Sequence, residues 1–99
     1  MSNGELLGEG EIENYMEDLP LWHRENNVII RNYVAQSFVD AVGLINSIAI
    51  YAEVKDHHPD ICLYGWNKLQ ITLTTHNKDG LTELDFELAR KIENLLMKS

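Results

Sequence analysis

A stripe of apolar residues at helical spacing occupies the middle of the chain and most constrains its fold. Its members are Phe38, Ala41, Val42, Ile45, Ile48, Ala49 and Ala52. Ser37 and Asp40 fit a capping box at the start of the stripe. Pro59 requires the helix to end by residues 56–58, because the residue before a proline disfavours helical backbone. The sequence therefore predicts one long helix whose Ile45, Ile48 and Ala49 belong to the core.

Two pairs of strand-like runs lie on either side of this helix. The first pair, residues 21–24 and 28–34, is separated by turn residues and is rich in β-branched side chains. The second pair, residues 61–64 and 68–76, is joined through Gly65. In its longer run Leu69, Ile71 and Leu73 share one face, opposite His76. Each pair is typical of a β-hairpin.

Helices are also expected near both ends of the chain. Residues 11–19 can form a short helix that Pro20 ends, and Thr82 with Asp85 fits a second capping box. The helix after Thr82 has a buried stripe of Leu84, Leu88, Ile92 and Leu95. We therefore expect an α+β fold in α-β-β-α-β-β-α order, with a four-stranded antiparallel sheet covered on one face by helices. Residues 11–99 would be a single domain, preceded by a flexible N-terminal arm at 1–10.

Composition narrows the possible functions. The net charge is -8 and no cluster of Lys and Arg occurs, so direct nucleic-acid binding is not expected. No apolar run has the length of a membrane span. Cys62 is the single cysteine, which favours a reducing compartment, with the cytoplasm as the default location. Its apolar neighbours on a predicted strand favour a small core residue over a nucleophile.

Histidines and carboxylates gather in two short segments. His57 and His58 follow Glu53 just before the predicted end of the helix, and His76 ends a predicted strand. Glu53 and His57 are four residues apart, so on a helix they would project from the same side. Because imidazole gains and loses protons near neutral pH, this grouping predicts a proton-transfer or metal site.

Simpler interpretations remain open for several of these residues. A lone histidine such as His23 is typical of a surface or capping residue. Trp22 and Trp66 could be core residues or could stack on a flat heterocycle. Two histidines and a carboxylate can bind zinc, but the spacing is not that of zinc proteases. The adjacent rings of His57 and His58 would also have difficulty reaching one ion from a regular helix.

Motifs in a fixed order span most of the chain, from Trp22 to Leu96. They are Ala52-Glu53-x-x-Asp56-His57-His58-Pro59, Trp66-Asn67-Lys68, Ile71-Thr72-Leu73-Thr74-Thr75-His76 and Gly80-Leu81-Thr82-x-x-Asp85-x-x-Leu88-Ala89. This ordered set closely resembles the pterin-4a-carbinolamine dehydratases. The stretch from Pro59 to His76 is slightly longer than in familiar members, and the link from Trp22 to Val28 is shorter.

The resemblance implies dehydration of 4a-hydroxytetrahydropterin to quinonoid dihydropterin, with no metal or organic cofactor. The implied acid/base residues are His57, His58 and His76. The implied pterin-binding residues are Glu53, Asp56, Thr74 and Thr75, with Trp22 and Asp85 at the edge of the pocket. The resemblance also implies a homodimer or homotetramer. Because members of the family can stabilise a transcription activator, a non-catalytic pterin-binding or coactivator role is the alternative.

Overall fold

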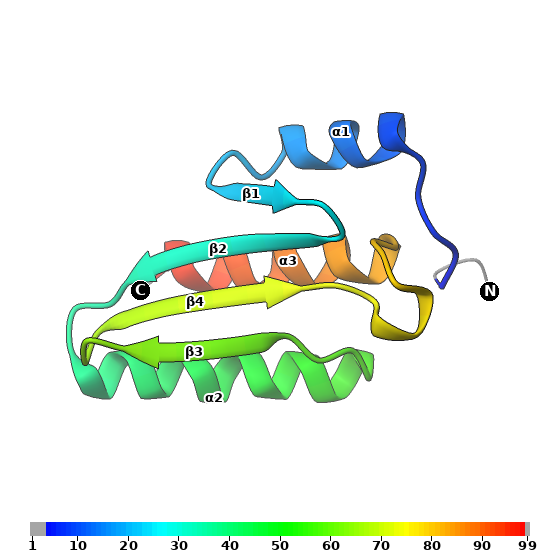
Figure 1. The fold of residues 1–99 in the computed structure, drawn as a ribbon. Coiled ribbons are helices and arrows are strands. Elements are labelled where there is room, and N and C mark those ends of the chain that lie inside the picture. The colour runs from blue at the N-terminus through cyan, green and yellow to red at the C-terminus, as the bar shows by residue number, and fades with distance from the viewer. Residues whose placement is uncertain (1–3, 99) are drawn as a thin grey trace.

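A four-stranded antiparallel sheet organises the chain, and helices lie against one of its faces (Figure 1). The computed structural model describes residues 4–98. The elements in chain order are α1 (Glu9–Glu17), β1 (Trp22–Glu25), β2 (Val28–Val34), α2 (Phe38–Lys55), β3 (Asp60–Tyr64), β4 (Lys68–Leu73), the 3-10 helix η1 (His76–Lys78) and α3 (Glu83–Met97). The α+β class and the α-β-β-α-β-β-α order expected from the sequence are confirmed.

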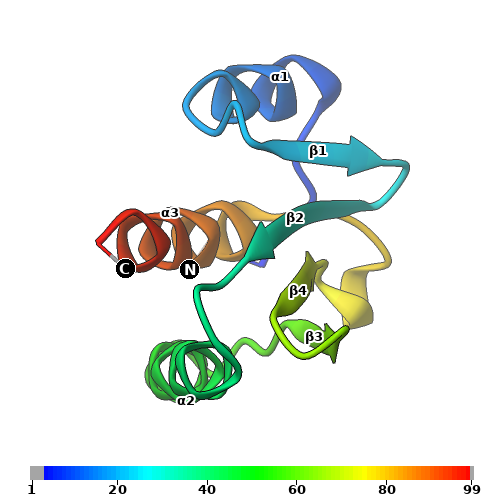
Figure 2. The ribbon, with the colours of Figure 1, turned by 90° about the vertical axis from the view of Figure 1, so that its left-hand side faces the viewer.

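The strand order is β1-β2-β4-β3, so the two hairpins meet along β2 and β4 at the centre of the sheet. Ile29 pairs with Leu73, and Ile61 of the edge strand β3 pairs with Ile71. Leu69, Ile71 and Leu73 have no exposed surface, which confirms the apolar face expected for β4. Figure 2 shows α2 and α3 on the same side of the sheet. The core therefore lies between this face and those two helices.

The buried side of α2 matches the expected one only in part, with Ile48 in the core as predicted. Ala41, Leu44, Ile48 and Ala52 are buried, whereas Ala49, which was expected in the core, is exposed. The prediction for Ala49 was wrong because apolar residues surround most of this helix. Five of them remain on the solvent side and define what we call the α2 apolar face: Phe38, Val39, Val42, Ile50 and Val54.

Cys62 lies in β3 but is exposed, so its predicted place in the core is wrong. Side chains alternate along a strand, and Ile61 and Leu63 are the β3 residues that pack against the core. Cys62 must then point to the opposite face of the sheet. No helix among residues 4–98 is long and apolar enough to cross a membrane.

Part of the arm expected over residues 1–10, namely residues 1–3, lies outside the described residues. In the remainder, the Leu7 backbone N–H donates to the Leu81 carbonyl oxygen at 3.0 Å. The helix α1 already begins at Glu9 and packs on α3, where the rings of Tyr15 and Phe86 stack with centroids 4.7 Å apart. The segment before α1 thus contacts the loop that leads into α3.

An ion pair with little exposure joins the sheet to α3. The Arg31 guanidinium donates to both carboxylate oxygens of Glu93, at 2.8 and 3.0 Å. The Trp22 indole N–H donates to the same carboxylate at 2.8 Å. Hydrogen bonds from Arg31 hold the pKa of Glu93 below its usual range. The contact fixes β1 and β2 against the helix.

We expect Glu93→Gln to lower the free energy of unfolding by about 3 kcal/mol at neutral pH, because it leaves the buried Arg31 without its charge partner. The folded-state pKa of Glu93 is lowered, so its contribution is present above the ordinary carboxyl value of 4.5. It is lost as the pH falls through the lowered folded value. Urea denaturation at several pH values should therefore show that the difference in free energy of unfolding between wild type and Glu93→Gln becomes smaller below pH 4.5.

Glu87→Gln is the matched control, because the Lys55–Glu87 pair is more exposed, with side-chain exposures of 39% and 28%. This change should cost less than about 1 kcal/mol. Two results would contradict the stabilising role of the Arg31–Glu93 ion pair. One is an equal loss of unfolding free energy in the two variants, and the other is a loss in Glu93→Gln that does not change in acid.

Candidate functional site

The predicted histidine site forms where the ends of α2 and β4 meet the start of α3. In the β3–β4 hairpin Asp60 pairs with Thr72, so the residues just before β3 lie beside those just after β4. Their side chains surround a hollow of about 270 Å³. Its lining consists of Asp56, His57, His58, Thr74, Thr75, His76 and Asn77. Antiparallel pairing thus brings together residues that are far apart in the sequence.

Most of the expected site residues lie at this hollow. The three expected histidines line it, together with the expected Asp56, Thr74 and Thr75. Glu53 is adjacent, because its Oε2 lies 2.7 Å from Nε2 of His58. Asn77 also lines the hollow and was not singled out from the sequence, where it reads only as part of a polar loop.

Trp22 is not brought to the hollow, which corrects its expected place at the pocket edge. It lies on β1, at the edge of the sheet opposite β3, and is only 4% exposed. Its indole N–H is bonded to Glu93. Trp22 is therefore a core residue. Trp66 is 60% exposed and lies in the β3–β4 turn, at the other end of β4 from the hollow.

His57 and His58 occupy different environments because the helix ends early. The last residue of α2 is Lys55, and Asp56 adopts a left-handed backbone conformation with φ 51°. This turn removes His57 from the helical alignment with Glu53 that the spacing predicted. His57 is 8% exposed, whereas the His58 side chain is 56% exposed and pairs with Glu53.

His76 approaches the hollow from the other loop. The strand β4 ends at Leu73 instead of continuing to residue 76, and His76 begins η1. A single antiparallel bridge between Thr75 and Gly80 closes the loop. His76 is exposed, so its ring faces solvent on the side of the hollow that η1 forms.

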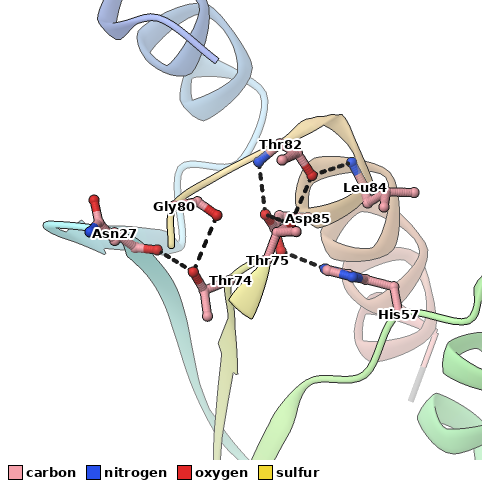
Figure 3. A network of polar contacts seen from close by, with 8 residues as sticks. All are labelled: Asn27, His57, Thr74, Thr75, Gly80, Thr82, Leu84 and Asp85. Carbon is pink, nitrogen blue, oxygen red and sulfur yellow. Dashed lines mark hydrogen bonds and ion pairs between the residues drawn. The ribbon is translucent and has the colours of Figure 1, made fainter. Parts of the chain in front are cut away.

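A buried polar network lies behind His57 (Figure 3). Nε2 of His57 lies 2.6 Å from Oδ1 of Asp85, which has no exposed surface. The other carboxylate oxygen, Oδ2, accepts from the Thr75 hydroxyl at 2.8 Å and from the Thr82 backbone N–H at 2.9 Å. Asp85 thus lies behind the hollow, not at its edge as expected.

The capping box of α3 explains how Asp85 reaches this position. Thr82 is the N-cap residue, and its hydroxyl accepts from the Leu84 backbone N–H at 3.3 Å. The carboxylate of Asp85 completes the box by accepting from Thr82. A negative charge is also favourable at a helix N-terminus. The sequence pattern indicated this helix start, but it gave no signal that the same carboxylate meets a histidine.

The hydroxyls of the two site threonines are already bonded within the protein. Thr74 donates to the Asn27 carbonyl oxygen at 2.6 Å, which links the site to the β1–β2 turn. Thr75 donates to Asp85. These hydroxyls therefore support the walls of the hollow.

Within residues 4–98, no group of three His, Cys, Asp or Glu side chains is arranged to hold a metal ion. The neighbouring histidines instead contact different carboxylates, His57 that of Asp85 and His58 that of Glu53. The groups that converge on the hollow are suited to proton exchange and to hydrogen bonding with a polar ligand.

Comparison with known proteins places the chain in a family. The family model described as pterin 4 alpha carbinolamine dehydratase matches residues 5–95. A Sulfurisphaera tokodaii protein, provisionally named a pterin-4-alpha-carbinolamine dehydratase, is 40% identical over 90 residues, covering 91% of this chain and 96% of that protein. A Nocardia farcinica protein with the same provisional name is 42% identical over 91 residues, covering 92% and 95%.

Solved structures show the same fold. The crystal structure of a transcriptional coactivator/pterin dehydratase from Brucella melitensis has a TM-score of 0.87 and 33% identity, covering 93% of this chain and 99% of that one. A pterin dehydratase-like protein identified as a RuBisCO assembly factor in the alpha-carboxysome has a TM-score of 0.62 and 18% identity, covering 76% and 86%, and shows likeness of fold alone. By sequence and by structure, the chain belongs to the pterin-4a-carbinolamine dehydratase family.

Proposed function

We propose that this chain dehydrates a 4a-hydroxytetrahydropterin to the quinonoid dihydropterin at the hollow lined by His57, His58 and His76. The observation that carries the proposal is the convergence of three imidazoles, from two separate loops, on one hollow. Family membership and the names of the relatives support the type of reaction.

The chemistry requires one proton donor and one proton acceptor. The bond between C4a and the hydroxyl oxygen breaks, and that oxygen leaves as water after it is protonated. The proton on N5 departs to a base, and a C4a–N5 double bond forms. A positioned acid or base typically contributes about 10²–10⁴-fold to such a step. No metal or organic cofactor is needed, because side chains can make both proton transfers.

His57 and His76 are the proposed proton-transfer pair. They reach the hollow from different loops, so one can act on N5 while the other acts on the departing hydroxyl. His58 would bind the substrate or share in the proton transfer. Its ring is exposed and pairs with Glu53, a contact between flexible surface side chains that a ligand can replace.

Carboxylates are suited to hold the pterin ring. Glu53 and Asp56 are exposed and lie beside or line the hollow. A carboxylate can accept from the ring N–H and the amino group of a pterin in a planar two-point contact. Thr74 and Thr75 would shape the wall against which the ring lies. Trp22 has no part in this binding mode, because it is buried away from the hollow.

Assembly into a homodimer or homotetramer is a further part of the proposal. The α2 apolar face exposes large side chains, with Val39 76%, Ile50 64% and Val54 78% exposed. A small domain gains stability by burying such surface against a second copy. The same face supports the alternative function, a binding protein without catalysis, because it could also receive a different protein. The proposed location is the cytoplasm, where the exposed thiol of Cys62 would stay reduced.

The reaction is tested by generating 4a-hydroxytetrahydropterin enzymatically and following its loss by ultraviolet absorbance. Wild type should accelerate dehydration above the spontaneous rate, and His57→Ala or His76→Ala should lower that acceleration by about 10²–10⁴-fold. Circular dichroism would establish that each variant is folded.

The control for the loss of an imidazole is His23→Ala. His23 is a half-exposed residue of β1, beside Glu25 at 3.5 Å and outside the hollow. Its replacement should leave the rate unchanged. Wild type that gives no acceleration would favour the binding function, and full activity of both His57→Ala and His76→Ala would contradict the proposed proton transfer.

The proposed assembly is tested by placing a charge on the α2 apolar face. Wild type should sediment as a dimer or tetramer, and Ile50→Asp or Val54→Asp should give a smaller species, because a buried unpaired carboxylate disfavours the interface. Met97→Asp, on α3 and 76% exposed, is the control and should leave the assembly unchanged. Monomeric wild type, or Ile50→Asp with unaltered assembly, would contradict this use of the face.

A further inference from the structure

We propose that Asp85 is a positioning residue that holds His57 with its proton on Nε2, so that His57 exchanges protons with the ligand through Nδ1. The inference deepens the proposed function and rests on it for the reaction, but the state of the ring can be observed without turnover. It also gives Asp85 a different role from the substrate contact expected from the sequence.

The contacts of Asp85 decide which partner carries the shared proton. Oδ2 already accepts from the Thr75 hydroxyl and the Thr82 backbone N–H. Asp85 also lies at the N-terminus of α3, and its carboxylate is the acceptor at each contact whose donor is known. An ionised carboxylate can only accept, so the 2.6 Å contact between Oδ1 and Nε2 of His57 requires the proton on Nε2.

The two threonine hydroxyls reinforce this arrangement. Thr75 and Thr82 lie 2.8 Å apart through their Oγ1 atoms. The Thr75 proton points to Asp85, so the Thr82 hydroxyl must donate to Thr75 while it accepts from the Leu84 backbone N–H. All donors in the chain of contacts are therefore directed toward the carboxylate. Because these residues are buried, neither water nor a neighbouring side chain can easily replace one of the contacts.

The second ring nitrogen of His57, Nδ1, is left for contact with a ligand. Among residues 4–98, Asn67 Oδ1 is the one buried side-chain polar atom that lacks a partner. Nδ1 of His57 also has no hydrogen bond among these residues, yet it is not one of the buried atoms without a partner. It must therefore be accessible to solvent. The hollow is the open space that His57 lines. A neutral ring with its proton on Nε2 thus presents the Nδ1 lone pair to a ligand.

Asp85→Asn reverses this geometry with almost no change in shape. The Thr75 and Thr82 donors would select the amide oxygen, which leaves the amide N–H groups to face His57. Nε2 would then have to accept, and the ring proton would move to Nδ1. A neutral ring with a proton on Nδ1 cannot receive another proton from the ligand at that atom.

The test combines histidine ring ¹⁵N NMR, at a pH where the rings are neutral, with dehydration kinetics. Wild-type His57 should show the Nε2–H tautomer, and Asp85→Asn should show the Nδ1–H tautomer. The same variant should lose about 10²–10⁴-fold in kcat with little change in KM, because the ring stays in place while its donor and acceptor atoms are exchanged. An Nδ1–H tautomer in wild type, or an unchanged tautomer in Asp85→Asn, would overturn the inference.

Asp40→Asn is the matched control, because Asp40 is the N3 residue of α2 and lies beside the N-cap Ser37. Asp40→Asn changes a carboxylate at a helix start that has no contact with a histidine. Both the tautomer of His57 and the rate of dehydration should therefore stay unchanged. If Asp85→Asn does not fold, the wild-type tautomer and Thr75→Val still decide the matter. Thr75→Val removes one donor to the carboxylate, and it should keep the Nε2–H tautomer with a smaller loss of kcat.

The two proposals can fail separately. A tautomer reversal in Asp85→Asn, with no dehydration by wild type, would reject the proposed reaction and support the positioning role. Normal dehydration by Asp85→Asn would reject the positioning role and leave the proposed reaction intact.

Discussion

The geometry of the candidate site depends on the hydrogen bonds that the buried carboxylate of Asp85 makes. A charged group without exposed surface is costly unless hydrogen bonds replace its water. Asp85 obtains these bonds from the α2–β3 loop through His57, from the end of β4 through Thr75 and from its own helix start through Thr82. Three chain segments must therefore come together for the carboxylate to be satisfied. The position of His57 follows from this requirement.

The sheet supplies the framework that makes this meeting possible. Antiparallel pairing of β3 with β4 places both loops of the site at one end of the sheet. The helix α3 is fixed at two points along its length, near its start by Asp85 and further on by the ion pair between Glu93 and Arg31. The central strand β2 contributes Arg31, so the same helix joins the site to the middle of the sheet. Stability and site geometry are thus coupled through α3.

The order of elements could be predicted from local signals, because each has a local cause. Capping at Ser37 and Thr82 starts two helices, and the alternation through Leu69 and Leu73 gives β4 its buried face. The rotation of α2 could not be predicted in the same way. Its apolar residues extend around most of the helix, and only contacts made elsewhere in the chain decide that Leu44 is buried and Ala49 is exposed.

The grouping of the three histidines could also be anticipated from the sequence, since a hairpin returns His76 to the level of His57. Their individual environments could not. The left-handed backbone at Asp56 turns His57 off the helical side that it was expected to share with Glu53, and its ring contacts Asp85. For Trp22 the sequence left core and ligand stacking open, and a distant contact with Glu93 decides for the core.

The central claim is that a reduced pterin binds where the three histidines converge. The most direct measurement is an NMR titration of the histidine ring signals with a stable dihydropterin that resembles the product. The account predicts saturable shifts of His57, His58 and His76, with His23 unchanged. A pterin that left these three rings unmoved would contradict it.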